Sequence, residues 1–127
     1  MDVIFEIEEQ WRGLLARGRV PIITSQDDIV TEGGDTTFRW KTFPLEDGNW
    51  ELDFIPSRNN SYLAPEVKHA TEIPCSMHPN AFLYGLGVWL RVDAGVRNID
   101  EMFPSSLFYL VRRCMLDKPP DRSFVYA

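Results

Sequence analysis

The stretch that most strongly indicates the fold reads TTFRWKTFPLEDGNWELDFI, residues 36–55. On both sides of Glu46-Asp47-Gly48, large apolar side chains alternate with polar ones, which is typical of half-buried β-strands. A three-residue loop at this point places glycine at the left-handed position that such loops require. The same register sets Trp40 opposite Phe54 on one face. The stretch therefore predicts an antiparallel hairpin at the centre of a small sheet.

Two further segments carry the three- and four-residue spacing of a helix with one buried face. The first covers the N-terminal residues and ends near Gly18, which suits a helix stop. The second begins after Ser105 or Ser106 and ends before Pro119-Pro120. The expected buried residues are Ile4, Ile7, Trp11 and Leu14 in the first helix, and Leu107, Leu110, Val111, Cys114 and Met115 in the second.

Residues 81–93 fit two structures. Apolar side chains at every second position from Phe82 to Val92 match a strand, and two interior glycines count against a helix. The alternative is a packed helix that is capped at Asn80 and stopped at Gly95. The strict alternation favours the strand.

Together these elements predict an α+β fold, in which an N-terminal and a C-terminal helix pack against a small antiparallel sheet. The chain has 127 residues, 44% hydrophobic and 25% charged, so we expect one globular domain, 1–127. The first residues are acidic, whereas a signal peptide starts with basic residues and an apolar run. Cys75 and Cys114 suit a reducing compartment. We therefore expect a cytoplasmic protein.

The net charge of −6 is concentrated between residues 27 and 53, where eight acidic residues face only Arg39 and Lys41. Such a surface does not bind a phosphate backbone, so we expect no direct nucleic-acid binding. The expected hairpin sets Glu51 and Asp53 against the two basic residues. The acids that remain for a basic partner are Asp27, Asp28, Glu32 and Asp35.

Aromatic residues make up 13% of the chain, which is rich for a small domain. Exposed aromatic side chains mark partner surfaces, because they contribute interface energy at a low cost in conformational entropy. We expect Tyr62, in the irregular centre of the chain, and Phe103, next to Pro104, to be exposed in this way.

Metal binding is the clearest chemical possibility. Cys75 and His78 have C-x-x-H spacing, and His69 is near in sequence. Zinc takes four protein ligands in a structural site, or three and a water in a catalytic one. A second ligand pair is missing, so we expect no metal, no other cofactor and no catalytic residue.

These features favour a non-enzymatic protein-binding module, such as an inhibitor, an immunity-type protein or an adaptor, whose acidic, aromatic-rimmed surface engages a basic protein. One alternative is a small ligand-binding protein or an enzyme with a pocket beside residues 56–80, since long irregular segments often carry function. Convergence of His69, Cys75 and His78 would favour that alternative. Another is a homo-oligomeric assembly subunit that buries its surplus aromatics by self-association.

Overall fold

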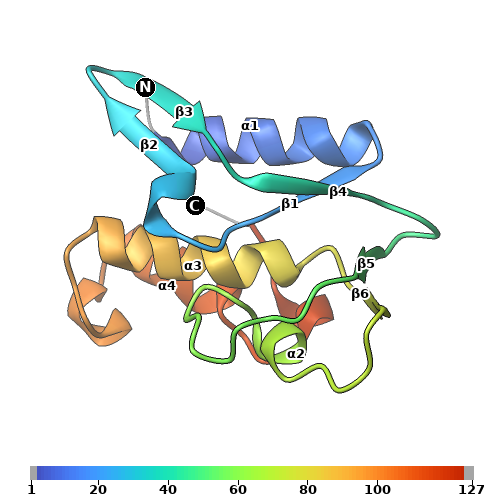
Figure 1. Cartoon of the computed structure of the whole chain (residues 1–127). Helices are drawn as coiled ribbons and strands as arrows, with labels where there is room; N and C mark the ends of the chain where they lie inside the picture. The colour runs from blue at the N-terminus through green and yellow to red at the C-terminus, as the bar shows by residue number, and fades with distance from the viewer. Residues whose placement is uncertain (1–2, 125–127) are drawn as a thin grey trace.

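A computed structural model describes residues 3–124 and has the predicted α+β fold, with helices at both ends (Figure 1). The helices are α1 (Val3–Ala16), α2 (Pro65–Lys68), α3 (Ala81–Asp93) and α4 (Ser106–Cys114). The strands are β1 (Arg19–Ile22), β2 (Ile29–Glu32), β3 (Asp35–Phe38), β4 (Lys41–Pro44), β5 (Trp50–Leu52) and β6 (Cys75–Met77). Short 3-10 turns form η1 (Gln26–Asp28), η2 (Ile99–Met102) and η3 (Pro119–Asp121).

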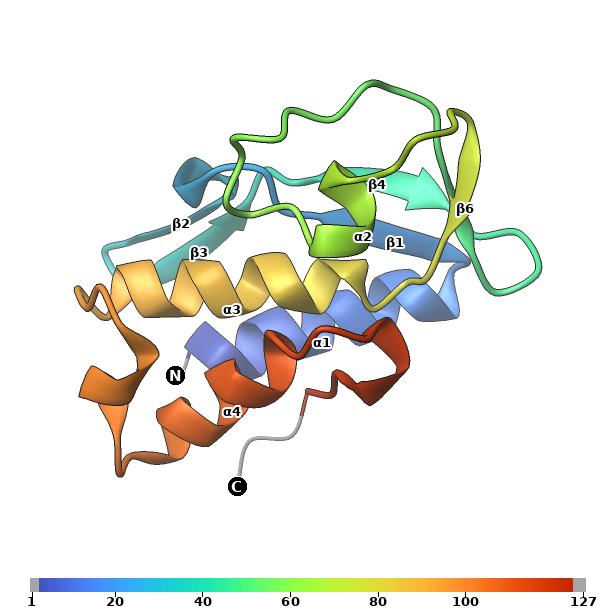
Figure 2. The same ribbon diagram turned by 90° about the horizontal axis from the view of Figure 1, so that it is seen from below.

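Helix α3 lies at the centre of the molecule. It packs against α4 on one side and against β1 on another, and β1 in turn packs against α1. Figures 1 and 2 show α3 crossing the middle of the domain, and in the view of Figure 1 β1 and β4 lie between it and α1. Among the described residues, no helix is long and apolar enough to cross a lipid bilayer.

The strands form three separate antiparallel ladders, β1–β4, β2–β3 and β5–β6, in place of the single expected sheet. The predicted register of the 36–55 hairpin is therefore wrong. Phe43 pairs with Val20 and Leu52 pairs with Cys75, while Trp40 lies outside the strands and packs edge-on against Phe82 of α3, 5.3 Å between ring centroids.

The turn between β4 and β5 explains the difference. Asp47 and Gly48 both have positive φ, 54° and 81°, and the Glu46–Asn49 bridge closes directly around them. This is a two-residue turn of the type that suits tight hairpins, and the left-handed conformation expected of Gly48 is confirmed. Beyond the bridge the two strands diverge, because each takes its hydrogen-bonding partner from another part of the chain.

Residues 81–93 form a helix, so the strand prediction is wrong and the alternative is right. Nine of the 13 residues of α3 are buried, so apolar side chains occupy nearly every face and alternation carries no information about the period. Both glycines allow close packing: a Cβ on Gly85 would lie 2.9 Å from the backbone carbonyl oxygen of Tyr62, and one on Gly87 would lie 2.5 Å from Cγ of the flexible Met115 side chain.

Both terminal helices are confirmed. Ile4, Ile7 and Trp11 of α1 are buried as expected, whereas Leu14 is only half-buried. The helix is followed by Gly18 at a φ of 73°. The Ser105 hydroxyl caps α4 by accepting a hydrogen bond from the Phe108 backbone N–H. Leu110, Val111 and Cys114 of α4 are buried as expected, while Leu107 and Met115 are half-buried.

A buried ion pair ties the last described residues to the centre of the chain. Arg122 is 2% exposed, and its Nη1 and Nη2 donate to the two carboxylate oxygens of Glu66 at 2.7 and 2.8 Å. The guanidinium also donates to the carbonyl oxygens of Leu116 and Asp117 and lies over the Tyr84 ring. The bidentate geometry and the additional acceptors satisfy a charge that would otherwise be costly to bury.

Candidate functional site

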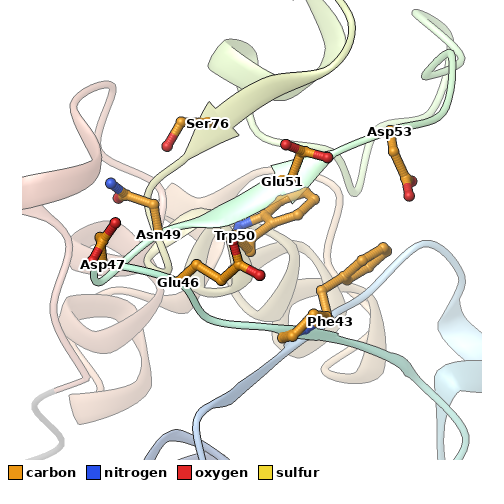
Figure 3. Close-up of a pocket in the computed structure, with 9 residues that line it drawn as sticks. Phe43, Glu46, Asp47, Asn49, Trp50, Glu51, Asp53 and Ser76 are labelled. Carbon is orange, nitrogen blue, oxygen red and sulfur yellow. The ribbon is translucent and has the colours of Figure 1, made fainter.

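An acidic cavity of about 430 Å³ lies beside the turn that joins β4 to β5 (Figure 3). We call it the acidic cavity; its lining residues are Phe43, Pro44, Glu46, Asp47, Asn49, Trp50, Glu51, Asp53 and Ser76. Strands β4 and β5 and the turn supply most of them, and β6 supplies Ser76. The divergence of β4 and β5 beyond the Glu46–Asn49 bridge opens the space.

Aromatic rings form one wall of the acidic cavity. Phe43 packs against Trp50, with ring centroids 4.9 Å apart, and against Phe54 at 6.0 Å. Trp50 is buried, and its indole N–H donates to the His78 carbonyl oxygen. This hydrogen bond fixes the indole, while Phe43 is only half-buried and so offers part of its ring to a ligand.

Four exposed carboxylates surround this wall, those of Glu46, Asp47, Glu51 and Asp53. Figure 3 shows Glu46, Glu51 and Asp53 grouped around the Phe43 and Trp50 rings. None of the four makes an ion pair or a side-chain hydrogen bond with another of residues 3–124. Their charges are therefore available to a ligand.

The expectation that Arg39 and Lys41 neutralise Glu51 and Asp53 is wrong, for the same reason as the register. Lys41 lies opposite Ile22 in the β1–β4 ladder. Arg39 follows β3, and its backbone N–H donates to the Asp28 carbonyl oxygen. Neither basic residue lies across a ladder from Glu51, which pairs with Ser76, or from Asp53, which follows β5.

The four acids predicted to attract a partner lie in two places. Glu32 and Asp35 are exposed and face each other at the tip of the β2–β3 ladder. Asp27 is exposed on η1, but Asp28 is half-buried and accepts hydrogen bonds from the backbone N–H and the hydroxyl of Thr24, at 2.8 and 3.4 Å. Asp28 therefore holds the loop before β2 in place.

Of the two aromatic residues predicted to be exposed, Phe103 is exposed, but the prediction for Tyr62 is wrong. Tyr62 is half-buried, and its hydroxyl donates to Oε1 of Gln26 at 2.6 Å. Burial raises the pKa of Tyr62; Arg91 opposes this rise, and Asp27 adds to it. Phe103 is 59% exposed and packs edge-on against Phe108, so its ring is accessible.

His69, Cys75 and His78 do not form a metal site. His69 is exposed at the end of α2 and Cys75 is half-buried in β6. Nδ1 of His78 accepts a hydrogen bond from the Asn80 backbone N–H. Nowhere in residues 3–124 do three His, Cys, Asp or Glu side chains form a group that could hold a metal ion.

The acidic cavity can bind a cation of organic size, because carboxylates supply charge and an aromatic ring supplies a polarised face. Sequence reasoning included its acids in the acidic stretch but assigned Glu51 and Asp53 to the wrong partners. No protein-family model, no curated protein and no solved structure matches this chain. The geometry alone therefore carries the functional argument.

Proposed function

We propose that the protein is a non-enzymatic, cytoplasmic protein-binding module, such as an inhibitor or an adaptor, whose acidic cavity receives a lysine or arginine side chain of a basic partner. The observation that carries the proposal is the set of four carboxylates that have no partner among residues 3–124 and lie beside the half-buried ring of Phe43. A guanidinium or ammonium group there gains charge-assisted hydrogen bonds and a cation–π contact.

The charge of the cavity favours a protein partner. Four carboxylates repel a phosphate backbone, and a chain with a net charge of −6 attracts basic surfaces over a distance of about 10 Å at 0.1 M salt. The cavity opens beside an exposed tight turn, Asp47-Gly48, so a protruding side chain can reach it without a change in the strands.

The test is the binding of a fluorescently labelled oligoarginine peptide, measured by anisotropy at low and moderate salt. A cavity variant removes the four carboxylates by Glu46→Gln, Asp47→Asn, Glu51→Gln and Asp53→Asn. Exposed ion pairs contribute about 0.2–1 kcal/mol each, so we expect a loss of roughly 1–4 kcal/mol in binding free energy. Phe43→Leu, which keeps the charge, should cost about 0.5–1 kcal/mol through the lost cation–π contact.

A matched control separates the cavity from the general charge of the protein. The control variant also removes four carboxylates, by Glu9→Gln, Asp27→Asn, Glu32→Gln and Asp35→Asn. We expect it to bind the peptide more tightly than the cavity variant does. Equal losses in the two variants would show that the peptide responds to net charge alone and would overturn the proposal for the cavity.

A further inference from the structure

A second cavity, opposite in charge, lies where the C-terminal part of α3, η2 and the last turn of α4 meet. Its volume is about 540 Å³. We call it the arginine groove; its lining residues are Arg91, Arg97, Asn98, Ile99, Arg112, Met115 and Leu116. Figure 2 shows α3 and α4 side by side, with the segment that contains η2 at the end of α3.

The side chains of the three arginines in the groove differ in their hydrogen bonding. Nη1 of Arg91 donates to the carbonyl oxygens of Val96 and Arg97, at 3.1 and 2.8 Å, and thereby holds the loop that follows α3. The guanidinium groups of Arg97 and Arg112 make no hydrogen bond or ion pair with any other of residues 3–124. Two cationic groups of this groove are thus unpaired in a chain that carries a net charge of −6.

One acid of the loop, Glu101, is already engaged. Oε2 of Glu101 accepts hydrogen bonds from the backbone N–H groups of Arg97 and Asn98, at 3.0 and 3.1 Å, as part of a capping box at the start of η2. A helix C-terminus favours a cation such as Arg112, but that effect does not account for Arg97, which lies before η2. Within residues 3–124 the fold therefore positions two arginines without acidic partners.

Apolar side chains complete the groove, and the backbone of one of them, Leu116, is fixed by a hydrogen bond. Ile99 and Met115 are half-buried, and Leu116 is 37% exposed. The Leu116 carbonyl oxygen accepts the Nε–H of Arg122 at 2.7 Å, so the chain after α4 is fixed by the buried ion pair. A preformed cavity with an apolar lining and a few polar groups, and with this volume, is typical of a small-molecule site.

We infer that the arginine groove binds a small organic anion, in which a carboxylate, sulfonate or phosphate group is carried on an apolar body. The anionic group meets Arg97 and Arg112 through charge-assisted hydrogen bonds. The apolar body covers Ile99, Met115 and Leu116. The site is independent of the acidic cavity, with which it shares no lining residue.

Two fluorescent probes with the same aromatic body test the inference, the anion anilinonaphthalene sulfonate and the neutral phenylnaphthylamine. The wild-type protein should bind the sulfonate saturably at one site. Replacement of both free cations, Arg97→Gln with Arg112→Gln, should weaken sulfonate binding about tenfold, equivalent to about 1.4 kcal/mol, and leave the neutral probe within about twofold. Leu116→Asn should weaken the binding of both probes.

The control variant Arg39→Gln with Arg58→Gln removes the same charge from exposed arginines outside the groove and should bind the sulfonate as the wild type does. Urea titration of every variant checks that the fold is retained. Absence of saturable sulfonate binding, or an equal loss in the control, would overturn the inference. Pelleting with phosphatidylglycerol vesicles that depends on Arg97 and Arg112 would also overturn it, because the groove would then belong to a membrane surface.

Discussion

The three helical glycines provide a quantitative test of the packing around α3. Replacement of glycine by alanine inside a helix gains about 0.5–1 kcal/mol from backbone entropy alone. At Gly13 in α1, the nearest atom to an added Cβ is Nη1 of Arg17 at 3.6 Å, an ordinary contact. Gly13→Ala should therefore stabilise the protein by about 0.5–1 kcal/mol.

At Gly85 the same change would cause a steric clash with Tyr62 and Ile23. The added Cβ would lie 2.9 Å from the Tyr62 carbonyl oxygen, 3.2 Å from Cβ of Ile23 and 3.3 Å from the Ile23 carbonyl oxygen. Overpacking of a core costs about 1–3 kcal/mol, and backbone atoms cannot move aside cheaply. After the gain in helix propensity, Gly85→Ala should lose about 1–2 kcal/mol of stability.

Gly87 lies between these cases, because its closest neighbour is the flexible side chain of Met115, although Cβ of Cys114 also lies 3.2 Å away. We expect a net change near zero for Gly87→Ala. Urea titrations of the three variants, analysed with one common slope of unfolding free energy against urea concentration, give the differences in the free energy of unfolding. If Gly85→Ala stabilised the protein as much as Gly13→Ala, the close approach of the Tyr62 and Ile23 backbone to α3 would be refuted.

Three further changes test other parts of the core. Glu66→Ala should cost about 3–5 kcal/mol of stability, because Arg122 would remain buried without its counter-ion; a loss below about 1 kcal/mol would contradict the buried ion pair. Leu110→Ala should cost about 2–5 kcal/mol, since the side chain is fully buried, and a shift below about half a kcal/mol in urea titration would contradict its burial. Burial raises the pKa of Cys114 to about 12, so the folded state keeps a proton that the unfolded state loses above about pH 8.5. The stability that this proton contributes is complete at neutral pH and is lost as the pH rises toward 12. Stability should therefore fall less steeply at alkaline pH in Cys114→Ala than in the wild type, as measured by unfolding at several pH values. Ellman's reagent should accordingly label Cys75 and spare Cys114 in the native protein at neutral pH.

Short-range sequence patterns were sufficient to predict the two terminal helices and the left-handed conformation of Gly48. A stripe such as Ile4, Ile7 and Trp11 depends only on spacing within one segment, and the preference of glycine for positive φ depends on one residue. Strand pairing depends on residues far away. Nothing near Lys41 in sequence indicates that β4 will pair with β1 and leave β5 to β6.

The prediction of a strand for residues 81–93, which form α3, failed for a different reason. A helix that is buried on nearly all faces has no polar side, so no stripe marks its period. Its glycines argue for a strand only when their packing role is unknown, because the space around Gly85 and Gly87 is set by neighbours that come from other segments. The acidic cavity could not be predicted for the same reason. The sequence shows the excess of acidic residues, but only the tertiary structure shows that Arg39 and Lys41 do not lie opposite Glu51 and Asp53.

The three separate ladders have a consequence for the dynamics of the domain. A two-stranded ladder is marginal by itself in water, and each ladder here is linked to α3. Strand β1 packs on the helix, and Gln26, just before β2, exchanges hydrogen bonds with Trp89 of α3. The backbone carbonyl of His78, three residues before the start of α3, accepts a hydrogen bond from Trp50 of β5. The ladders share no strand, so β2–β3 can open while β1–β4 and β5–β6, which are in contact through Phe43 and Trp50, stay closed. Amide hydrogens of the strands should then exchange with solvent through separate local openings, and those of α3 only when the whole molecule unfolds. Native-state hydrogen exchange would thus divide the domain into a slow central helix and faster-exchanging ladders around it, with β2–β3 opening separately from the other two.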